Sequence, residues 1–137
     1  MEQPTVLIVE DDAAALLLTR RVLSQWRPDL NLMIAMDGEE AIQQVMEAER
    51  QQKLPLMVLL DWNLPKKHGR EVLAEVRNHP GTQGVPVVIV TSSNAEPDKS
   101  EAMNLGANEF VHKSLSLDEF RQSLINTCDK YLPAANT

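Results

Sequence analysis

The sequence predicts a doubly wound α/β fold, in which a five-stranded parallel sheet is covered by helices on both faces. Short apolar runs alternate five times with longer stretches of helical periodicity along the 137 residues. Residues typical of turns and helix caps separate the apolar runs from the helical stretches. Several of the apolar runs end in a polar or charged residue, which is typical of strands that deliver side chains to one edge of a parallel sheet.

The expected elements follow one another in a regular order. Strands are predicted at residues 6–9, 32–35, 56–60, 87–90 and 110–112. Helices are predicted over residues 13–26, after the Asp37-Gly38 turn, over about 70–78 and about 98–105, and after Ser116. Ser116 and Glu119 have the spacing of a capping box, and Gly106 suits the position just after a helix end. Right-handed crossovers between parallel strands then place helices on both faces of the sheet.

Composition limits the possible function classes. A chain of 137 residues, 43% hydrophobic and 24% charged, is long enough for one domain with a substantial core. The net charge of −7 argues against a nucleic-acid surface, and the single cysteine, Cys128, excludes an internal disulfide. Neither a signal peptide nor a membrane-spanning apolar run is recognisable. We therefore expect a cytoplasmic protein that does not enter the membrane, with one domain over residues 1–132 and a flexible tail over 133–137.

The polar residues at the strand ends indicate a phosphate and metal site. The third strand runs into Asp61, the first into Glu10 and Asp11, the fourth into Thr91 and the fifth into Lys113. These ends lie at the same edge of a parallel sheet, where converging carboxylates raise one another's pKa unless a cation is present. Oxygen ligands suit Mg²⁺, and a hydroxyl and an ammonium group can hold phosphoryl oxygens. The pattern predicts that Asp61 accepts a phosphoryl group.

The same residues are compatible with less specific roles. A single aspartate after a strand is commonly the N-cap of the next helix, and a threonine or lysine there means little alone. A second class is a Mg²⁺-dependent phosphohydrolase that passes through an aspartyl-phosphate, but such an enzyme would need a carboxylate where the chain has Asn63. A third class is a protein-binding module that is never phosphorylated. Trp62 is either partly exposed beside the site or packed under the loop.

Four stretches of the chain resemble the receiver domain of two-component response regulators. They are residues 9–12, residues 61–65 with Gly69, residues 90–92, and residues 106–113. The resemblance extends from about Pro4 to Leu132. It implies a flavodoxin-like receiver fold and a protein that takes a phosphoryl group from a histidine kinase without being an enzyme in the usual sense.

The resemblance also assigns roles to individual residues. Asp61 matches the phosphoacceptor of the family, Asp11 a direct Mg²⁺ ligand and Glu10 a ligand through water. Asn63 matches a position that binds the metal through its backbone carbonyl. Asp12 corresponds to a variable position and is left out of the site.

The remaining matched positions concern phosphate binding and switching. Thr91 corresponds to the switch hydroxyl, Lys113 to the phosphate-contacting lysine and Phe110 to the aromatic switch residue. Ser114 replaces the proline that usually follows the lysine, and a cis Lys113-Ser114 bond without proline would cost about 3 kcal/mol. The geometry of that bond is therefore left open.

Two further stretches are similar to stand-alone response regulators that partner phytochrome-type histidine kinases. These stretches are residues 64–73 and 112–114. The first helix carries one apolar stripe and additional leucines beside it: Ala15, Leu18, Val22 and Trp26, with Leu16, Leu17 and Leu23. Some of this apolar surface should remain free to bind a partner, and in the resembled family the first helix contacts the kinase. The alternative is a helix that packs on two sides.

The last helix predicts a second surface. A stripe that should face the sheet contains Leu117, Phe120, Leu124, Cys128 and Tyr131. Ile125 and Leu132 lie on a flank, and with Phe110 they are expected to form an apolar surface near the fourth and fifth helices. Because the resembled family dimerises or binds targets there, a homodimer through this face is expected.

Overall fold

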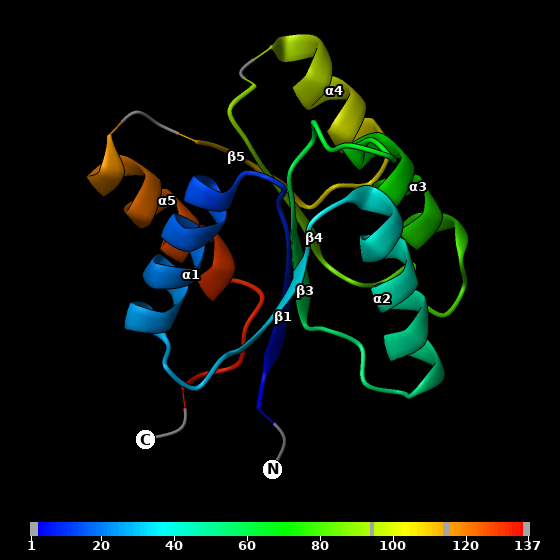
Figure 1. The fold of residues 1–137 in the computed structure, drawn as a ribbon, viewed down its shortest axis with the longest axis horizontal. Coiled ribbons are helices and arrows are strands. Elements are labelled where there is room, and N and C mark those ends of the chain that lie inside the picture. Colours follow the sequence, from blue (N-terminus) through cyan, green and yellow to red (C-terminus); the bar gives the residue numbers. More distant parts are fainter. Residues whose placement is uncertain (1–2, 94, 114–115, 136–137) are drawn as a thin grey trace.

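The computed structural model describes residues 3–93, 95–113 and 116–135. One five-stranded parallel sheet has the order β2-β1-β3-β4-β5 (Figure 1). The strands are β1 (Thr5–Val9), β2 (Asn31–Ala35), β3 (Met57–Leu60), β4 (Val87–Thr91) and β5 (Glu109–His112). The helices are α1 (Ala13–Trp26), α2 (Gly38–Arg50), α3 (Gly69–Asn78), α4 (Glu96–Asn104) and α5 (Leu117–Asp129). The predicted doubly wound fold is confirmed.

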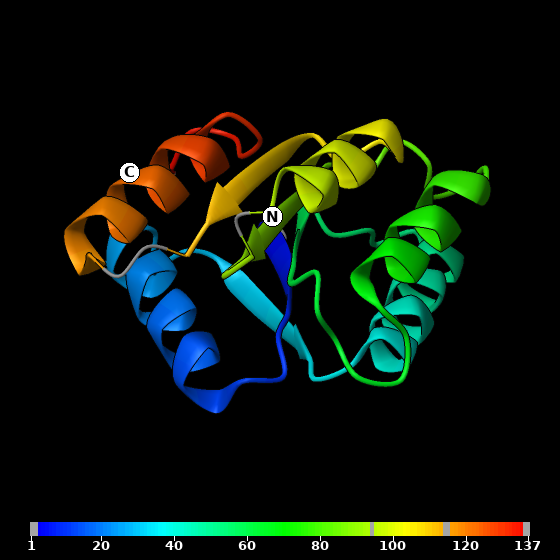
Figure 2. The ribbon, with the colours of Figure 1, turned by 90° about the horizontal axis from the view of Figure 1, so that it is seen from above.

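The helices cover the two faces of the sheet unequally. α1 and α5 lie on one face, and α2, α3 and α4 lie on the other (Figures 1 and 2). Successive strand residues alternate between the faces, so each face has its own hydrophobic cluster. In β1, Leu7 and Val9 pack towards α2 and α3, whereas Val6 and Ile8 pack towards α1 and α5. None of the helices in the described ranges is long and apolar enough to cross a membrane.

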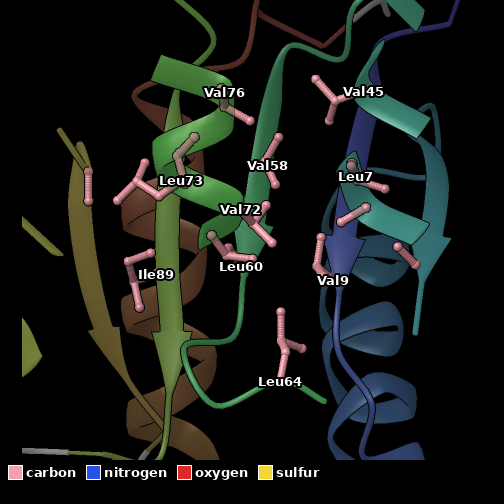
Figure 3. Close-up of a cluster of buried hydrophobic side chains, with 14 of the residues drawn as sticks. Leu7, Val9, Val45, Val58, Leu60, Leu64, Val72, Leu73, Val76 and Ile89 are labelled. Carbon is pink, nitrogen blue, oxygen red and sulfur yellow. The ribbon is translucent and has the colours of Figure 1, made fainter. Parts of the chain in front are cut away.

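The cluster beneath α2 and α3 holds the central strands in place (Figure 3). Val72, Leu73 and Val76 of α3 face the sheet at helical spacing and are each at most 1% exposed. Burying a side chain of this size stabilises the folded state by roughly 1.5–3 kcal/mol. The carboxyl end of β3 is therefore fixed by packing on both faces.

Local capping explains where most helices begin. The carboxylates of Asp12 and Asp37 accept backbone N–H groups of α1 and α2, and the Ser116 hydroxyl accepts the Glu119 N–H of α5. α4 begins at Glu96, two residues earlier than predicted, because Pro97 suits the first turn of a helix. Gly106 follows α4 with a φ of +103°, a conformation that favours glycine, as its predicted role requires.

The residues predicted to form an apolar surface near the fourth and fifth helices do not form one, so this prediction is wrong. Leu132 is buried in the core at 9% exposure, and Leu117 is 55% exposed instead of facing the sheet. Phe110 packs against the cluster below α2, α3 and α4, whereas Ile125 packs against the cluster below α1 and α5. Sequence spacing along α5 alone could not reveal that β5 places Phe110 on the opposite face from α5.

The first helix leaves apolar surface exposed, as expected. Val22 and Leu23 are buried, while Leu16, Leu18 and Trp26 are partly buried against the cluster shared with α5. Leu17 is 50% exposed. The helix thus packs on two neighbouring sides and still presents a leucine to solvent. The same cluster encloses Cys128, whose burial raises the pKa of its thiol to about 12.

Candidate functional site

Three carboxylates meet at the carboxyl edge of the sheet. Glu10 and Asp11 follow β1, and Asp61 follows the neighbouring strand β3, where its N–H donates to the Val9 carbonyl at 3.0 Å. One oxygen from each carboxylate lies within 4.8 Å of the others. Asp61 is 8% exposed and Glu10 4%, whereas Asp11 faces solvent. The structure therefore brings together the acidic residues that the sequence placed at one edge.

Two further predicted residues border this acidic cluster. The ammonium group of Lys113 contacts a carboxylate oxygen of Glu10 and lies 3.8 Å from an oxygen of Asp61. Its backbone N–H donates to the Thr91 carbonyl at 2.8 Å, which fixes the ends of β4 and β5 relative to each other. Thr91 is fully buried, and its hydroxyl oxygen accepts the Ser93 N–H at 3.3 Å.

Electrostatics at the cluster follows from crowding and burial. Burial raises the pKa of the Glu10 carboxyl, the hydrogen bond from Lys113 opposes this shift, and the negative charge of Asp61 adds to it. One lysine therefore compensates a cluster of three acidic groups only in part. A divalent cation would relieve the remaining repulsion.

A helix-capping role for Asp61 is excluded by the position of α3. That helix begins at Gly69, and its cap is His68, whose ring nitrogen Nδ1 accepts the Arg70 N–H at 3.0 Å. Asp12, by contrast, is a cap, because its carboxylate accepts the Ala14 N–H at 3.2 Å. Asp61 is thus a nearly buried carboxylate without a capping role.

The loop from Asp61 to Gly69 is closed at its base. The Gly69 N–H donates to the Trp62 carbonyl at 2.8 Å, and a Cβ at Gly69 would lie only 2.8 Å from backbone atoms of Asp61 and Trp62. Trp62 is fully buried, so of its two predicted placements the packed one is correct. Asn63 lies exposed in this loop.

Sequence reasoning missed the part that His68 plays in this loop. Besides capping α3, its ring contacts the ring of Trp62 edge to face, with centroids 5.2 Å apart and planes at 83°. The only signal in the sequence was its position directly before a helix that opens with glycine. Phe110, the expected aromatic switch, is partly buried on β5, and the Lys113-Ser114 bond lies outside the described residues.

The donor set fits a hard divalent cation. Glu10, Asp11 and Asp61 offer carboxylate oxygens, the ligand type that Mg²⁺ prefers. The donors come from the ends of two adjacent strands, and the Asp11 carboxylate among them is exposed to solvent.

A flavodoxin-like parallel sheet with an acidic cluster and a lysine at its carboxyl edge defines the class of phosphoacceptor receivers. The sequence model of the response regulator receiver domain matches residues 6–125. The chain belongs to the response regulator receiver family, and its function is that of a receiver in two-component signal transduction.

Individual relatives agree with this assignment. Response regulator Rcp1 of Synechocystis sp. is 40% identical over 117 residues, covering 83% of this chain and 79% of that protein. The structure of the phosphorylated cyanobacterial phytochrome response regulator RcpA superposes with a TM-score of 0.82 at 30% identity, covering 98% of this chain and 97% of that one. The Mn²⁺-bound form of Rcp1 superposes with a TM-score of 0.81 at 32% identity, covering 98% and 99%.

Proposed function

We propose that Asp61 accepts a phosphoryl group from a phosphohistidine of a histidine kinase, with Mg²⁺ bound at the same edge. The observation that carries the proposal is the position of Asp61, a nearly buried carboxylate beside Glu10, Asp11 and Lys113 that caps no helix. A nearly buried carboxylate without a capping role is costly to the fold, and its occurrence beside two other acidic groups at a sheet edge points to chemistry.

The transfer is a nucleophilic displacement at phosphorus. A carboxylate oxygen of Asp61 forms a bond to phosphorus, and the bond from phosphorus to the histidine nitrogen breaks. The electron pair of the broken bond stays on the leaving imidazole, which takes up a proton from solvent. With acetyl phosphate as donor, the phosphorus–oxygen bond breaks instead, and acetate leaves.

Lys113 and Thr91 are suited to bind the transferred group. The ammonium group of Lys113 already lies 3.8 Å from Asp61 and is positioned to pair with a phosphoryl oxygen. The Thr91 hydroxyl, at the end of the adjacent strand β4, is our candidate for a second donor. Movement of Thr91 towards the phosphoryl group would free space for Phe110 on β5, whose backbone is paired with β4.

Glu10, Asp11, Asp61 and the backbone carbonyl of Asn63 would hold the Mg²⁺. When bound, the cation neutralises the charge that develops on the phosphoryl oxygens. The Mn²⁺-bound form of Rcp1 supports a divalent cation in a related receiver. Among this chain's own residues, Lys113 lies between the two buried carboxylates: it contacts Glu10 and is 3.8 Å from an oxygen of Asp61, so its charge favours the ionised form of the attacking group.

We further infer that the partner is a phytochrome-type histidine kinase and that the protein works in the cytoplasm as a stand-alone regulator. Support comes from the similarity to the phytochrome response regulator RcpA and to Rcp1. The exposed Leu17 on α1, flanked by Arg20 and Arg21, is the surface that we assign to the kinase.

The alternatives are less well supported. A phosphohydrolase would need a general acid or base two residues after the nucleophile, and Asn63 supplies an amide there. A receiver that only binds proteins would have no use for three converging carboxylates. We therefore infer a phosphoacceptor and not a turnover enzyme.

Labelling with acetyl phosphate tests the proposal. Wild-type protein should take up an acid-stable, base-labile phosphate only with Mg²⁺ present. Asp61→Asn keeps the shape of the side chain and should abolish uptake. Asp12→Asn is the matched control, since asparagine also caps a helix, and it should be labelled like wild type. Uptake by Asp61→Asn would show that a different residue is the acceptor.

A homodimer through the face of α4 and α5 remains a second proposal. The residues predicted for that face are buried or lie on opposite sides of the sheet. Met103 and Leu105, at the end of α4, are instead 42% and 36% exposed. These two side chains are the exposed apolar groups that α4 and its C-cap offer for self-association.

A further inference from the structure

His68 joins the loop that carries the phosphoacceptor to the start of α3. Its Nδ1 atom accepts the Arg70 N–H at 3.0 Å and so caps the helix. Its ring contacts the buried ring of Trp62, the residue that follows Asp61 in the chain. The next residue, Gly69, closes the loop by donating its N–H to the Trp62 carbonyl at 2.8 Å. One imidazole therefore contacts both ends of the loop.

Only the neutral form of His68 can make this set of contacts. An imidazole that accepts a hydrogen bond at Nδ1 carries its single proton on Nε2. The imidazolium form has N–H groups at both positions and no acceptor, so protonation removes the cap from the Arg70 N–H. It also places a positive charge at the amino end of α3, where the helix dipole disfavours cations.

The charged groups around His68 come from α3 and α4. Arg70 of α3 disfavours a second positive charge, while Glu71 of α3 and Asp98 and Glu101 of α4 favour it. Glu101 is itself paired with Arg70 at 2.9 Å, and Asp98 accepts the Ser93 hydroxyl at 2.6 Å. Burial is the largest influence and, together with Arg70, it lowers the pKa of His68 below its ordinary value of 6.5.

We propose that His68 is a positioning residue for phosphorylation, which in its neutral form holds the Asp61–Gly69 loop through the α3 cap and Trp62 and releases it when protonated. The inference rests on the proposed role of Asp61 as phosphoacceptor. Loss of the α3 cap loosens the loop that carries Asp61 and Asn63, so the acceptor carboxylate is held less well for in-line attack. Phosphorylation should therefore become slower as the pH falls below about 6.5, beyond the effect of titrating carboxylates.

The first arm of the test measures the loop without any phosphate donor or metal. In a Trp26→Phe background, Trp62 is the remaining tryptophan of the chain, and its fluorescence reports the contact with His68. Between about pH 8 and about pH 5.5 we expect a transition with a midpoint below 6.5, the ordinary value for histidine. His68→Asn should lack this transition, because asparagine caps a helix but does not titrate. His79→Asn, which changes a histidine beside Glu49, should keep it.

The second arm measures the rate of Asp61 phosphorylation by acetyl phosphate at saturating Mg²⁺. Between about pH 7.5 and about pH 5.5, the rate of wild type should fall about fivefold more than that of His68→Asn, the factor that corresponds to one helix cap. His68→Ala should be slow already at about pH 7.5, because it lacks the cap at every pH.

Each result decides a separate point. Parallel pH profiles of wild type and His68→Asn, or a fluorescence transition that persists in His68→Asn, would overturn the role of His68. Absence of label from wild type at about pH 7.5 would instead refute the phosphoacceptor proposal, and the fluorescence arm would still show whether His68 governs the loop.

Discussion

The two edges of the same sheet use charged side chains in opposite ways. At the amino edge, Arg77 donates to the carbonyls of Gln83, Val85 and Gly106 and to the side-chain oxygen of Asn108, at 2.7–3.0 Å. Arg27, only 5% exposed, donates to both carboxylate oxygens of Asp29 and to the Pro133 carbonyl, each at 2.8 Å. At the carboxyl edge, three acidic groups share one lysine.

This difference separates the edge that stabilises the fold, the amino edge, from the edge that carries the proposed site, the carboxyl edge. Arg27, which is buried, and Arg77, which is partly buried, donate hydrogen bonds to carbonyl groups at this edge, and these hydrogen bonds stabilise the folded state. The carboxylates of Glu10 and Asp61 gain little from their position, and burial raises the pKa of Glu10. The hydrogen bonds of the arginines thus stabilise the amino edge, whereas the acidic cluster at the carboxyl edge lowers the stability of the fold.

The largest expected effect on stability comes from removing the hydrogen bonds that Arg77 makes at the amino edge. Arg77→Ala should lower the free energy of unfolding by about 2–3 kcal/mol, because several oxygen acceptors of two turns lose a charged donor at once. Urea unfolding measures the change. The rate of Asp61 phosphorylation should stay close to wild type at temperatures where the variant is folded.

Arg50→Ala is the matched control for this change. Arg50 pairs with Glu47 on the surface of α2, where both side chains are well exposed, so its loss should change the stability far less than Arg77→Ala does. Equal losses in Arg77→Ala and Arg50→Ala would contradict the view that the amino edge stabilises the fold.

A smaller effect of opposite sign is expected at the carboxyl edge. The pKa of Glu10 in the folded state is raised above 4.5, so the folded state binds a proton more tightly than the unfolded state does. The folded state therefore loses stability as the pH rises through the folded-state pKa of Glu10. Glu10→Gln should therefore raise the free energy of unfolding at pH 7 without divalent cations, because it removes a charge that burial disfavours. The gain should vanish below about pH 4.5, where the carboxyl is protonated in both states.

Thermal unfolding across this pH range, with Glu75→Gln as the exposed control on α3, measures the effect. Mg²⁺ should stabilise the wild type more than Glu10→Gln, because binding adds stability by mass action. A Glu10→Gln variant that is less stable than wild type at pH 7 without Mg²⁺ would show that the Lys113 contact outweighs burial.

Sequence patterns predicted the sheet, its helices and the acidic edge because these depend on periodicity and on strand ends in parallel order. Asp61, Glu10, Asp11, Thr91 and Lys113 were found in this way, and the structure places them together. Contacts between segments that are distant in sequence could not be predicted from these patterns. The hydrogen bonds of Arg77 to the turns and the pairing of Lys113 with Glu10, 103 residues apart, depend on the packed fold.

The prediction about the α5 face failed for a related reason. Helical spacing identified an apolar stripe, but it could not tell how far Leu132 turns into the core or that Leu117 projects into solvent. The role of His68 was missed because a histidine cap has no strong sequence signature, unlike Ser116 and Asp37, which belong to the preferred capping residues.

A change in association, not in folding, is expected at the exposed end of α4. Met103→Glu should weaken a phosphorylation-dependent dimer roughly tenfold by placing charge on the exposed end of α4, while leaving phosphorylation intact. Leu17→Glu, on the far side of the sheet, is the control. Sedimentation with and without acetyl phosphate measures both. Equal association of Met103→Glu and wild type would place any interface elsewhere.

The most direct test of the central claim is a Mg²⁺ titration followed by backbone amide shifts. The account predicts that shifts concentrate at residues 10–11, 61–63, 91 and 113, and that Asp11→Ala weakens binding by about tenfold or more. Asp12→Ala, which removes only a helix cap, should bind Mg²⁺ like wild type. Unchanged affinity in Asp11→Ala, or shifts centred away from Asp61, would contradict the assignment of the carboxyl edge as the site of metal binding and phosphorylation.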